Sequence, residues 1–132
     1  MSSQELRRSN RYSDFLPITV FIRKKDGLKR IAGPLSARII DVSNHGACLV
    51  LTQIVVQSYH IFHSTKDNES VVLGLNITLP SHEEPVEILS IPVWMNTSTM
   101  DDIKIFKMGV DFTSAIDDEL IHSINKYIFL LT

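Results

Sequence analysis

Three arginines near the start of the chain are the first residues whose type and spacing suggest chemistry. Arg7, Arg8 and Arg11 lie within five positions, among serines and an asparagine that disfavour a regular helix. A guanidinium offers a planar fork of donors that matches two phosphate oxygens or the O6 and N7 atoms of guanine, which a lysine cannot imitate. The spacing therefore predicts a segment that binds an anion or a guanine. The alternative is a solvated, mobile tail.

A second cluster, D-V-S-N-H-G at 41–46, combines a carboxylate, a hydroxyl and a glycine. The Asp41 carboxylate can accept hydrogen bonds from the N1 and N2 donors of a guanine. The Ser43 hydroxyl can bond a ligand oxygen or brace its own turn. Gly46 can let the backbone approach a ligand or can merely permit the bend. Taken by itself, the cluster favours a plain turn between two strands over a binding motif.

Alternating apolar residues predict the strands that must position these two clusters. Side chains of alternating character predict a strand at 17–24, a returning strand at 35–42 and a third strand that leaves the turn at Ala47. If the first two strands pair as an antiparallel hairpin, the chain just after Arg11 lies beside Asp41. The arginines and the acidic turn are then expected to share one end of the fold.

The rest of the chain predicts further short strands and one helix. The remaining elements are an insertion or long loop near 52–70, a strand at 71–79, an edge or bulged strand at 86–95, a turn at 96–102, a strand at 106–112 and an amphipathic helix at 115–131. Gly33-Pro34 is read as turn punctuation, and Gly74 is expected to mark a bulge or bend. This order predicts a mainly β fold, a small six-stranded antiparallel β-barrel with a C-terminal α-helix.

Composition bounds the class of protein. With 132 residues, 44% hydrophobic, the chain suits one domain with one core. A single cysteine and no long apolar run predict a cytoplasmic protein without a disulfide framework or stable membrane insertion. Residues 1–30 hold eight of the thirteen basic side chains and only three acidic ones. This asymmetry predicts one anion-binding face rather than a broad nucleic-acid-binding surface.

Two other groupings could carry chemistry. His60 and His63 have the spacing of metal ligands, but no cysteine or carboxylate pattern completes a site. Asp41, His45 and Cys48 are close in sequence, yet Cys48 falls in an alternating strand, where an inert, packed thiol is expected. We therefore predict no catalytic residues, no metal and no cofactor.

In the order of its motifs the sequence resembles the PilZ domain, a bacterial receptor module for cyclic di-GMP (c-di-GMP). The family signature is an R-x-x-x-R leader followed by D-x-S-x-x-G. Arg7 with Arg11 matches the first motif, and Asp41, Ser43 and Gly46 match the second.

The resemblance continues through later strands and has two departures. The segments 91–94 and 108–112 look like the family's later V-V-W and G-x-x-F strands, so the resemblance covers most of the chain. Trp94 can stack on a guanine or serve as packing. The insertion near 52–70 is longer than usual, and His45 stands where many members carry a glycine. Histidine tolerates positive φ better than most residues, so we expect the turn to survive.

The resemblance implies a non-enzymatic, cytoplasmic c-di-GMP receptor. A mobile basic leader, 1–16, is expected to become ordered against a single barrel domain, 17–132, and so to couple ligand binding to an unidentified downstream protein partner. The chain is expected to be a monomer or homodimer that binds no nucleic acid. The ligand-binding residues implied are Arg7, Arg8, Arg11, Asp41, Ser43 and Gly46.

The alternative function is a nucleotide-independent protein-interaction β-barrel, a degenerate PilZ-like adaptor. Its support is the apolar content of the insertion, Tyr59, Ile61 and Phe62, and of the end of the chain, 128–131, which could form exposed contact surfaces. An oligonucleotide-binding barrel is a weaker alternative, because aromatic and basic residues do not alternate along any strand.

Overall fold

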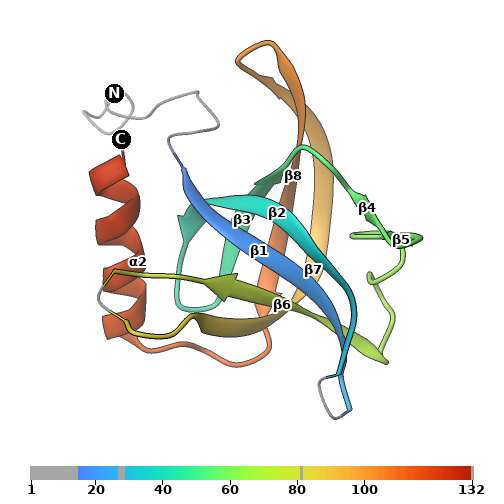
Figure 1. Ribbon diagram of the computed structural model, residues 1–132, viewed down its shortest axis with the longest axis horizontal. Helices are drawn as coiled ribbons and strands as arrows, with labels where there is room; N and C mark the ends of the chain where they lie inside the picture. The colour runs from blue at the N-terminus through green and yellow to red at the C-terminus, as the bar shows by residue number, and fades with distance from the viewer. Residues whose placement is uncertain (1–14, 27–28, 81, 132) are drawn as a thin grey trace.

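The computed structural model describes residues 15–26, 29–80 and 82–131, and it confirms the six-stranded barrel (Figure 1). The strands close in the order β1-β2-β3-β8-β7-β6, and every neighbouring pair is antiparallel. Helix α2 lies against one side of the barrel. The elements are β1 (Leu16–Lys24), β2 (Arg30–Val42), β3 (Gly46–Leu51), β6 (Val71–Ile77), β7 (Val86–Met100), β8 (Ile103–Phe112) and α2 (Asp118–Leu131).

The core is formed by the inward-facing half of each strand. Along β1, Leu16, Ile18, Val20 and Ile22 are buried while the residues between them are at least partly exposed, as the alternation predicts. Ile124 of α2 is fully buried in the same cluster, so the helix covers part of the barrel. No helix within the described ranges is long and apolar enough to cross a membrane.

Strand β2 is longer than predicted because Gly33-Pro34 lies inside it. The pairing with β1 continues on both sides of these residues, with a register shift between Val20 and Ile22. Gly33 has φ of +119°, a conformation that glycine adopts without steric cost. The two residues therefore form an irregularity within a continuous strand and do not separate two strands.

The predicted turn at 96–102 is also wrong. Strand β7 runs on to Met100 and pairs with β8, and only Asp101 and Asp102 form the turn. Both aspartates have positive φ, 56° and 63°, the geometry of a tight two-residue hairpin turn. The expectation of a bulge in the earlier part of this strand is confirmed, because the β7–β8 register shifts between Pro92 and Trp94.

The insertion folds against the barrel and does not expose its apolar residues. It contains a short hairpin, β4 (Val55–Val56) with β5 (Tyr59–His60). Ile61 is fully buried in the main core, and Tyr59 and Phe62 pack against that core. These three residues therefore do not form the exposed apolar contact surface that was expected on the insertion.

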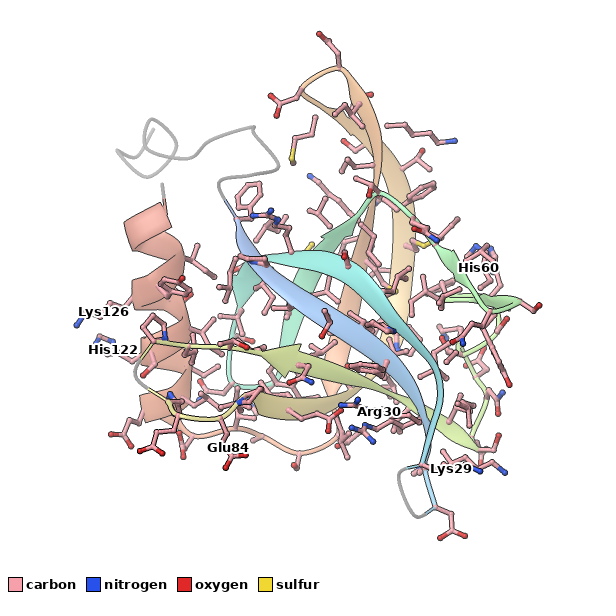
Figure 2. All side chains as sticks on the ribbon, in the orientation of Figure 1. Lys29, Arg30, His60, Glu84, His122 and Lys126 are labelled. Atoms are coloured by element: carbon pink, nitrogen blue, oxygen red, sulfur yellow. The ribbon has the colours of Figure 1, made fainter. Side chains whose placement is uncertain are left out.

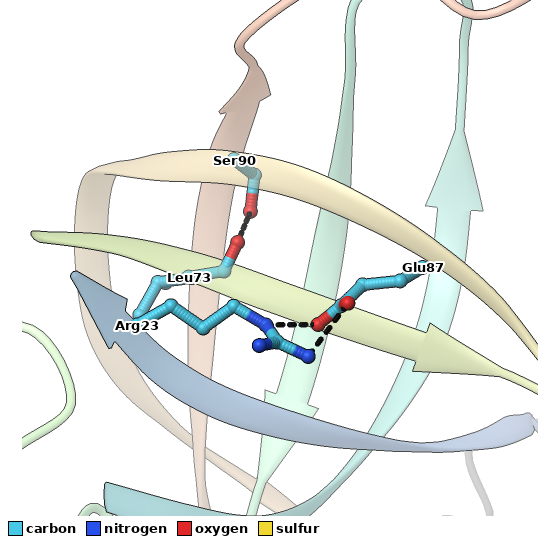
Figure 3. Close-up of polar contacts among 4 residues, drawn as sticks. All are labelled: Arg23, Leu73, Glu87 and Ser90. Carbon is cyan, nitrogen blue, oxygen red and sulfur yellow. Dashed lines mark hydrogen bonds and ion pairs between the residues drawn. The ribbon is translucent and has the colours of Figure 1, made fainter. Parts of the chain in front are cut away.

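Gly74 does not mark a bulge, since its pairing with β1 and β7 is regular on both sides. Instead, an ion pair joins Arg23 of β1 to Glu87 of β7 (Figure 3). Arg23 donates from Nε to Glu87 Oε2 at 2.5 Å and from Nη2 to Oε1 at 2.7 Å. A Cβ at position 74 would overlap the Glu87 carboxylate, so glycine leaves room for the pair.

Helix α2 begins at Asp118, three residues later than the expected start at 115. The Leu120 amide donates to Asp117 Oδ1 at 2.8 Å, so Asp117 caps the helix. The preceding backbone is engaged elsewhere, because the Ile116 amide donates to the Asn44 carbonyl at 3.1 Å. The helix therefore starts only after this tertiary contact.

Candidate functional site

The predicted acidic turn lies at the head of a row of residues that crosses four strands. Asp41 on β2 pairs with Cys48 on β3, Cys48 pairs with Gly109 on β8, and Gly109 pairs with Trp94 on β7. Directly opposed residues in antiparallel strands point to the same face. Because Asp41 and Trp94 are exposed, this row lies on the outer face of the barrel.

A pocket of about 310 Å³ opens along this row, a volume at the low end for small-molecule sites. Asp41, Ser43 and Gly46, the three described residues of the predicted ligand set, all line it. We call it the turn pocket, and its full lining is Asp41, Val42, Ser43, His45, Gly46, Ala47, Cys48, Val93, Trp94, Gly109, Val110 and Asp111.

Gly46 is required by close packing and not by its backbone angles. The turn survives with His45 in place, as expected, and neither His45 nor Gly46 has positive φ. A Cβ on Gly46 would overlap the Val110 carbonyl oxygen and lie 3.4 Å from Asp111 Oδ1. The glycine thus lets β3 approach β8 closely beneath the pocket.

Ser43 braces its own turn, one of the two roles open to it. Its amide donates to the Gly46 carbonyl at 2.9 Å, which closes the turn. Its hydroxyl makes longer contacts, donating to the same carbonyl at 3.4 Å and accepting from the His45 amide at 3.3 Å. Contacts this long leave the hydroxyl able to reorient toward a ligand.

Trp94 forms an aromatic wall of the pocket. Its indole lies over Gly109, where a Cβ would overlap the ring. The side chain remains 42% exposed, which is unusual for a tryptophan that serves only as packing.

A second carboxylate, that of Asp111, lines the pocket with Asp41 and was not singled out from the sequence. Asp111 is the direct partner of Gly46, so only the β3–β8 register could have revealed it.

The turn pocket is acidic. Asp41 and Asp111 contribute carboxylates, and no lysine or arginine of the described chain lines it. Burial raises the pKa of the Cys48 thiol, with Lys107 acting in the opposite direction and Asp41 adding to the increase. The pocket therefore favours donor groups of a ligand over its anionic groups, and it disfavours a thiolate at Cys48.

The arginines Arg7, Arg8 and Arg11 lie outside the described residues, but the point where the chain enters the barrel is described. Leu16 pairs with Ile39, and Arg38 Nη1 donates to the Phe15 carbonyl at 2.8 Å. Phe15 is buried in a small outer cluster with Val50, two residues from Cys48 on β3. The predicted β1–β2 hairpin therefore brings the start of β1 beside the pocket.

Four of the five other basic residues of the first thirty lie far from this entry point, and the fifth, Arg23, pairs with Glu87. Lys24, Lys25, Lys29 and Arg30 flank the β1–β2 turn, at the end of β2 opposite to Asp41. Figure 2 shows Lys29 and Arg30 at this end. All four are exposed, and the Arg30 guanidinium lies 3.7 Å from the centre of the Phe21 ring. These four cations therefore lie away from the turn pocket. The predicted single anion-binding face stays a prediction, because Arg7, Arg8 and Arg11 lie outside the described residues.

The two other candidate groupings have different outcomes. The rings of His60 and His63 are 4.3 Å apart, but His60 Nδ1 accepts the amides of Phe62 and His63, at 3.1 and 2.9 Å. Among the described residues, no group of three potential metal ligands was found. Asp41, His45 and Cys48 all line the turn pocket, where the raised pKa of the thiol argues against a nucleophilic role.

Comparisons with known proteins identify a solved structure with a similar fold. No protein-family model and no curated protein matches the chain. Among solved structures, the chain is similar to the PlzA protein of Borreliella burgdorferi in complex with c-di-GMP, with a TM-score of 0.50 and 13% sequence identity. The match covers 98% of this chain and 49% of that chain, so this chain spans about half the length of PlzA. At this identity the likeness shows a shared fold.

Proposed function

We propose that the chain is a non-enzymatic c-di-GMP receptor that binds its ligand at the turn pocket. The observation that carries the proposal is the convergence of Asp41, Ser43 and Gly46 with an exposed tryptophan in one pocket, beside the point where the chain enters the barrel. The similar fold of PlzA, which was solved with c-di-GMP, gives independent support.

The pocket suits the base of such a ligand better than its phosphates. A guanine presents N1–H and N2–H donors, which complement the carboxylates of Asp41 and Asp111. The exposed face of Trp94 offers a stacking surface for the base. Gly46 keeps the floor of the pocket free of a side chain.

The phosphates require cations that the described lining does not contain. Arg11 precedes Phe15 by four residues, so its Cα lies within about 14 Å of Phe15. In the proposal, the leader arginines close over a base in the pocket and pair with phosphate oxygens. In this proposal, binding orders the part of the leader that precedes Phe15, since Phe15 and Leu16 already belong to the barrel, and a downstream protein partner recognises the ordered form.

The alternative, a nucleotide-independent interaction barrel, has lost part of its support. Ile61 is buried and Phe62 packs against the core, so these side chains form no open contact surface on the insertion. The proposal of a c-di-GMP receptor is therefore the better supported of the two.

A calorimetric titration tests the proposed function. The full chain is expected to bind c-di-GMP and to bind neither cyclic di-AMP nor GTP comparably. Asp41→Ala should weaken binding at least tenfold, about 1.5 kcal/mol, because it removes hydrogen bonds to a charged acceptor. Glu69→Ala, an exposed carboxylate in the insertion, is the matched control and should leave the affinity unchanged. A folded sample that binds no c-di-GMP at tens of micromolar would refute the proposal.

A further inference from the structure

The turn that lines the pocket has a second side, which faces helix α2. Ser43, His45 and Gly46 line the turn pocket, whereas Asn44 does not. Asn44 is half-buried, although Ser43 and His45 on either side of it are exposed. The turn is therefore in contact with a potential ligand through three residues and with the rest of the fold through the fourth.

Asn44 holds the segment that leads into α2 by three hydrogen bonds. Its carbonyl accepts from the Ile116 amide at 3.1 Å, and its side-chain Nδ2 donates to the Ile116 carbonyl at 3.0 Å. Nδ2 also donates to Asp118 Oδ1 at 2.7 Å. The next turn residue is held as well, since the Phe112 amide donates to the His45 carbonyl at 2.7 Å.

The chemistry of these contacts selects an asparagine. Both side-chain partners, the Ile116 carbonyl and the Asp118 carboxylate, are acceptors, so the amide must present its nitrogen to them. An aspartate of nearly the same shape would set a carboxylate against two acceptors. Asn44 therefore carries a donor function that its closest isostere lacks.

We propose that Asn44 is the positioning residue of the ligand site. It acts through the turn, holding the carboxyl end of β2 and the start of α2 as one unit while Ser43 and Gly46 meet the ligand. The inference rests on the proposed c-di-GMP function. Because coupling between two equilibria is reciprocal, ligand in the pocket also strengthens the hold on the start of α2.

The test uses the full chain and compares substitutions at both ends of this contact. Asn44→Ala should weaken c-di-GMP binding by about fivefold or more and speed amide hydrogen exchange both in the turn and at Leu120 and Ile121. Asn44→Asp should weaken binding further. Asp118→Asn, which keeps an acceptor oxygen, should bind like the unmodified chain. The double variant Asn44→Asp with Asp118→Asn swaps donor and acceptor, so it should recover part of the lost affinity.

Asn68→Ala is the matched control. Asn68 also braces a turn with its side chain, accepting from the Ser70 amide and donating to the Ser64 carbonyl, but it lies in the insertion. Its loss should speed exchange only there and leave ligand affinity unchanged. Unchanged affinity in both Asn44 variants, or no recovery in the double variant, would overturn the positioning role.

The proposed function and this inference fail in different ways. If the unmodified chain does not bind c-di-GMP, the proposed function fails and the ligand role of Asn44 fails with it. The exchange measurement still judges the link between turn and helix, which is refuted if Asn44→Ala affects only one of the two segments. If the unmodified chain binds and Asn44→Ala binds equally well, only the inference about Asn44 fails.

Discussion

The two ends of strand β2 carry opposite charges. At its carboxyl end the turn pocket holds Asp41 and Asp111 with no described cation in its lining. At its amino end Lys24, Lys25 and Arg30 are exposed around the β1–β2 turn. The strand between them has 13 residues, and at about 3.3 Å per residue its two ends are roughly 40 Å apart when extended. Basic residues that are close in sequence to the leader therefore belong to the end of the barrel remote from the pocket.

This separation indicates which cations can contact a ligand in the turn pocket. The cations at the β1–β2 turn lie too far away to reach a phosphate held at the turn pocket, whereas the chain enters the barrel at Phe15 and Leu16 beside it. The proposal therefore divides the basic residues of the sequence into leader arginines that bind the ligand and cations at the β1–β2 turn that do not. The following predictions test that division, from the largest expected effect to the smallest.

Removing the leader arginines should have the largest effect. Arg7→Ala combined with Arg11→Ala should weaken c-di-GMP binding at least a hundredfold, since hydrogen bonds to charged groups contribute about 1.5–3 kcal/mol each. The matched pair at the other end, Lys29→Ala with Arg30→Ala, removes the same charge and should change the affinity less than twofold. Calorimetry measures both. Equal losses in the two double variants would show that the charge acts over the whole molecule.

Removing the aromatic wall of the pocket should have the next largest effect. Trp94→Ala should weaken binding by about tenfold to a hundredfold, because stacking of a base on an aromatic ring contributes about 1–3 kcal/mol. Val55→Ala removes a similarly exposed apolar side chain outside the pocket and should bind normally. An unchanged affinity for Trp94→Ala would mean that the indole only packs over Gly109 and does not stack on the ligand.

A substitution at Gly74 of β6, which pairs with Phe21 of β1, should lower stability and leave ligand binding intact. Gly74→Ala should lower the free energy of unfolding by about 1 kcal/mol, because the new methyl displaces the Arg23–Glu87 pair. Urea denaturation measures the loss. In a Glu87→Ala background the same substitution should cost less, since the clashing carboxylate is gone. An equal cost in both backgrounds would contradict this explanation.

The smallest effect concerns the insertion. Burial, with a further contribution from His63, lowers the pKa of His60 below its usual 6.5. The folded state therefore favours the neutral ring, and this contribution is complete above pH 6.5 and declines as the pH falls below it. Protonation of Nδ1 would also displace the amides of Phe62 and His63.

Hydrogen exchange, corrected for intrinsic rates, provides the measurement. The amides of Phe62 and His63 should lose protection between pH 7.5 and 5.5, while Leu49 in the β3–β8 ladder keeps it. His60→Asn retains an acceptor near the position of Nδ1 and should remove the pH dependence. A pH dependence that persists in this variant would identify another group as its source.

Sequence reasoning reached the parts of the fold and site that are encoded locally. Alternation identified β1, and the D-x-S-x-x-G residues converge in one pocket because they lie within a single turn. Reasoning failed where tertiary pairing decides the outcome. Asp111 was missed, and Trp94 was left open between stacking and packing. Both join the pocket only through the register of β8 with β3 and β7, which no local pattern contains.

Tertiary contacts also explain the misassigned elements. The polar residues from Asn96 onward suggested a turn, but pairing with β8 keeps them in a strand until Asp101. Gly74 suggested a bulge, yet the space it leaves is filled by side chains from two neighbouring strands. Similarly, the buried position of Ile61 depends on how the insertion folds back onto the barrel.

The indole over Gly109 has a practical consequence. Trp94 is the only tryptophan in the chain, and it lies in the turn pocket with much of its surface open to solvent. Intrinsic emission excited at the indole band therefore originates from this one location. Occupancy of the pocket can be followed optically in the unlabelled protein, through quenching or a spectral shift of a single native fluorophore.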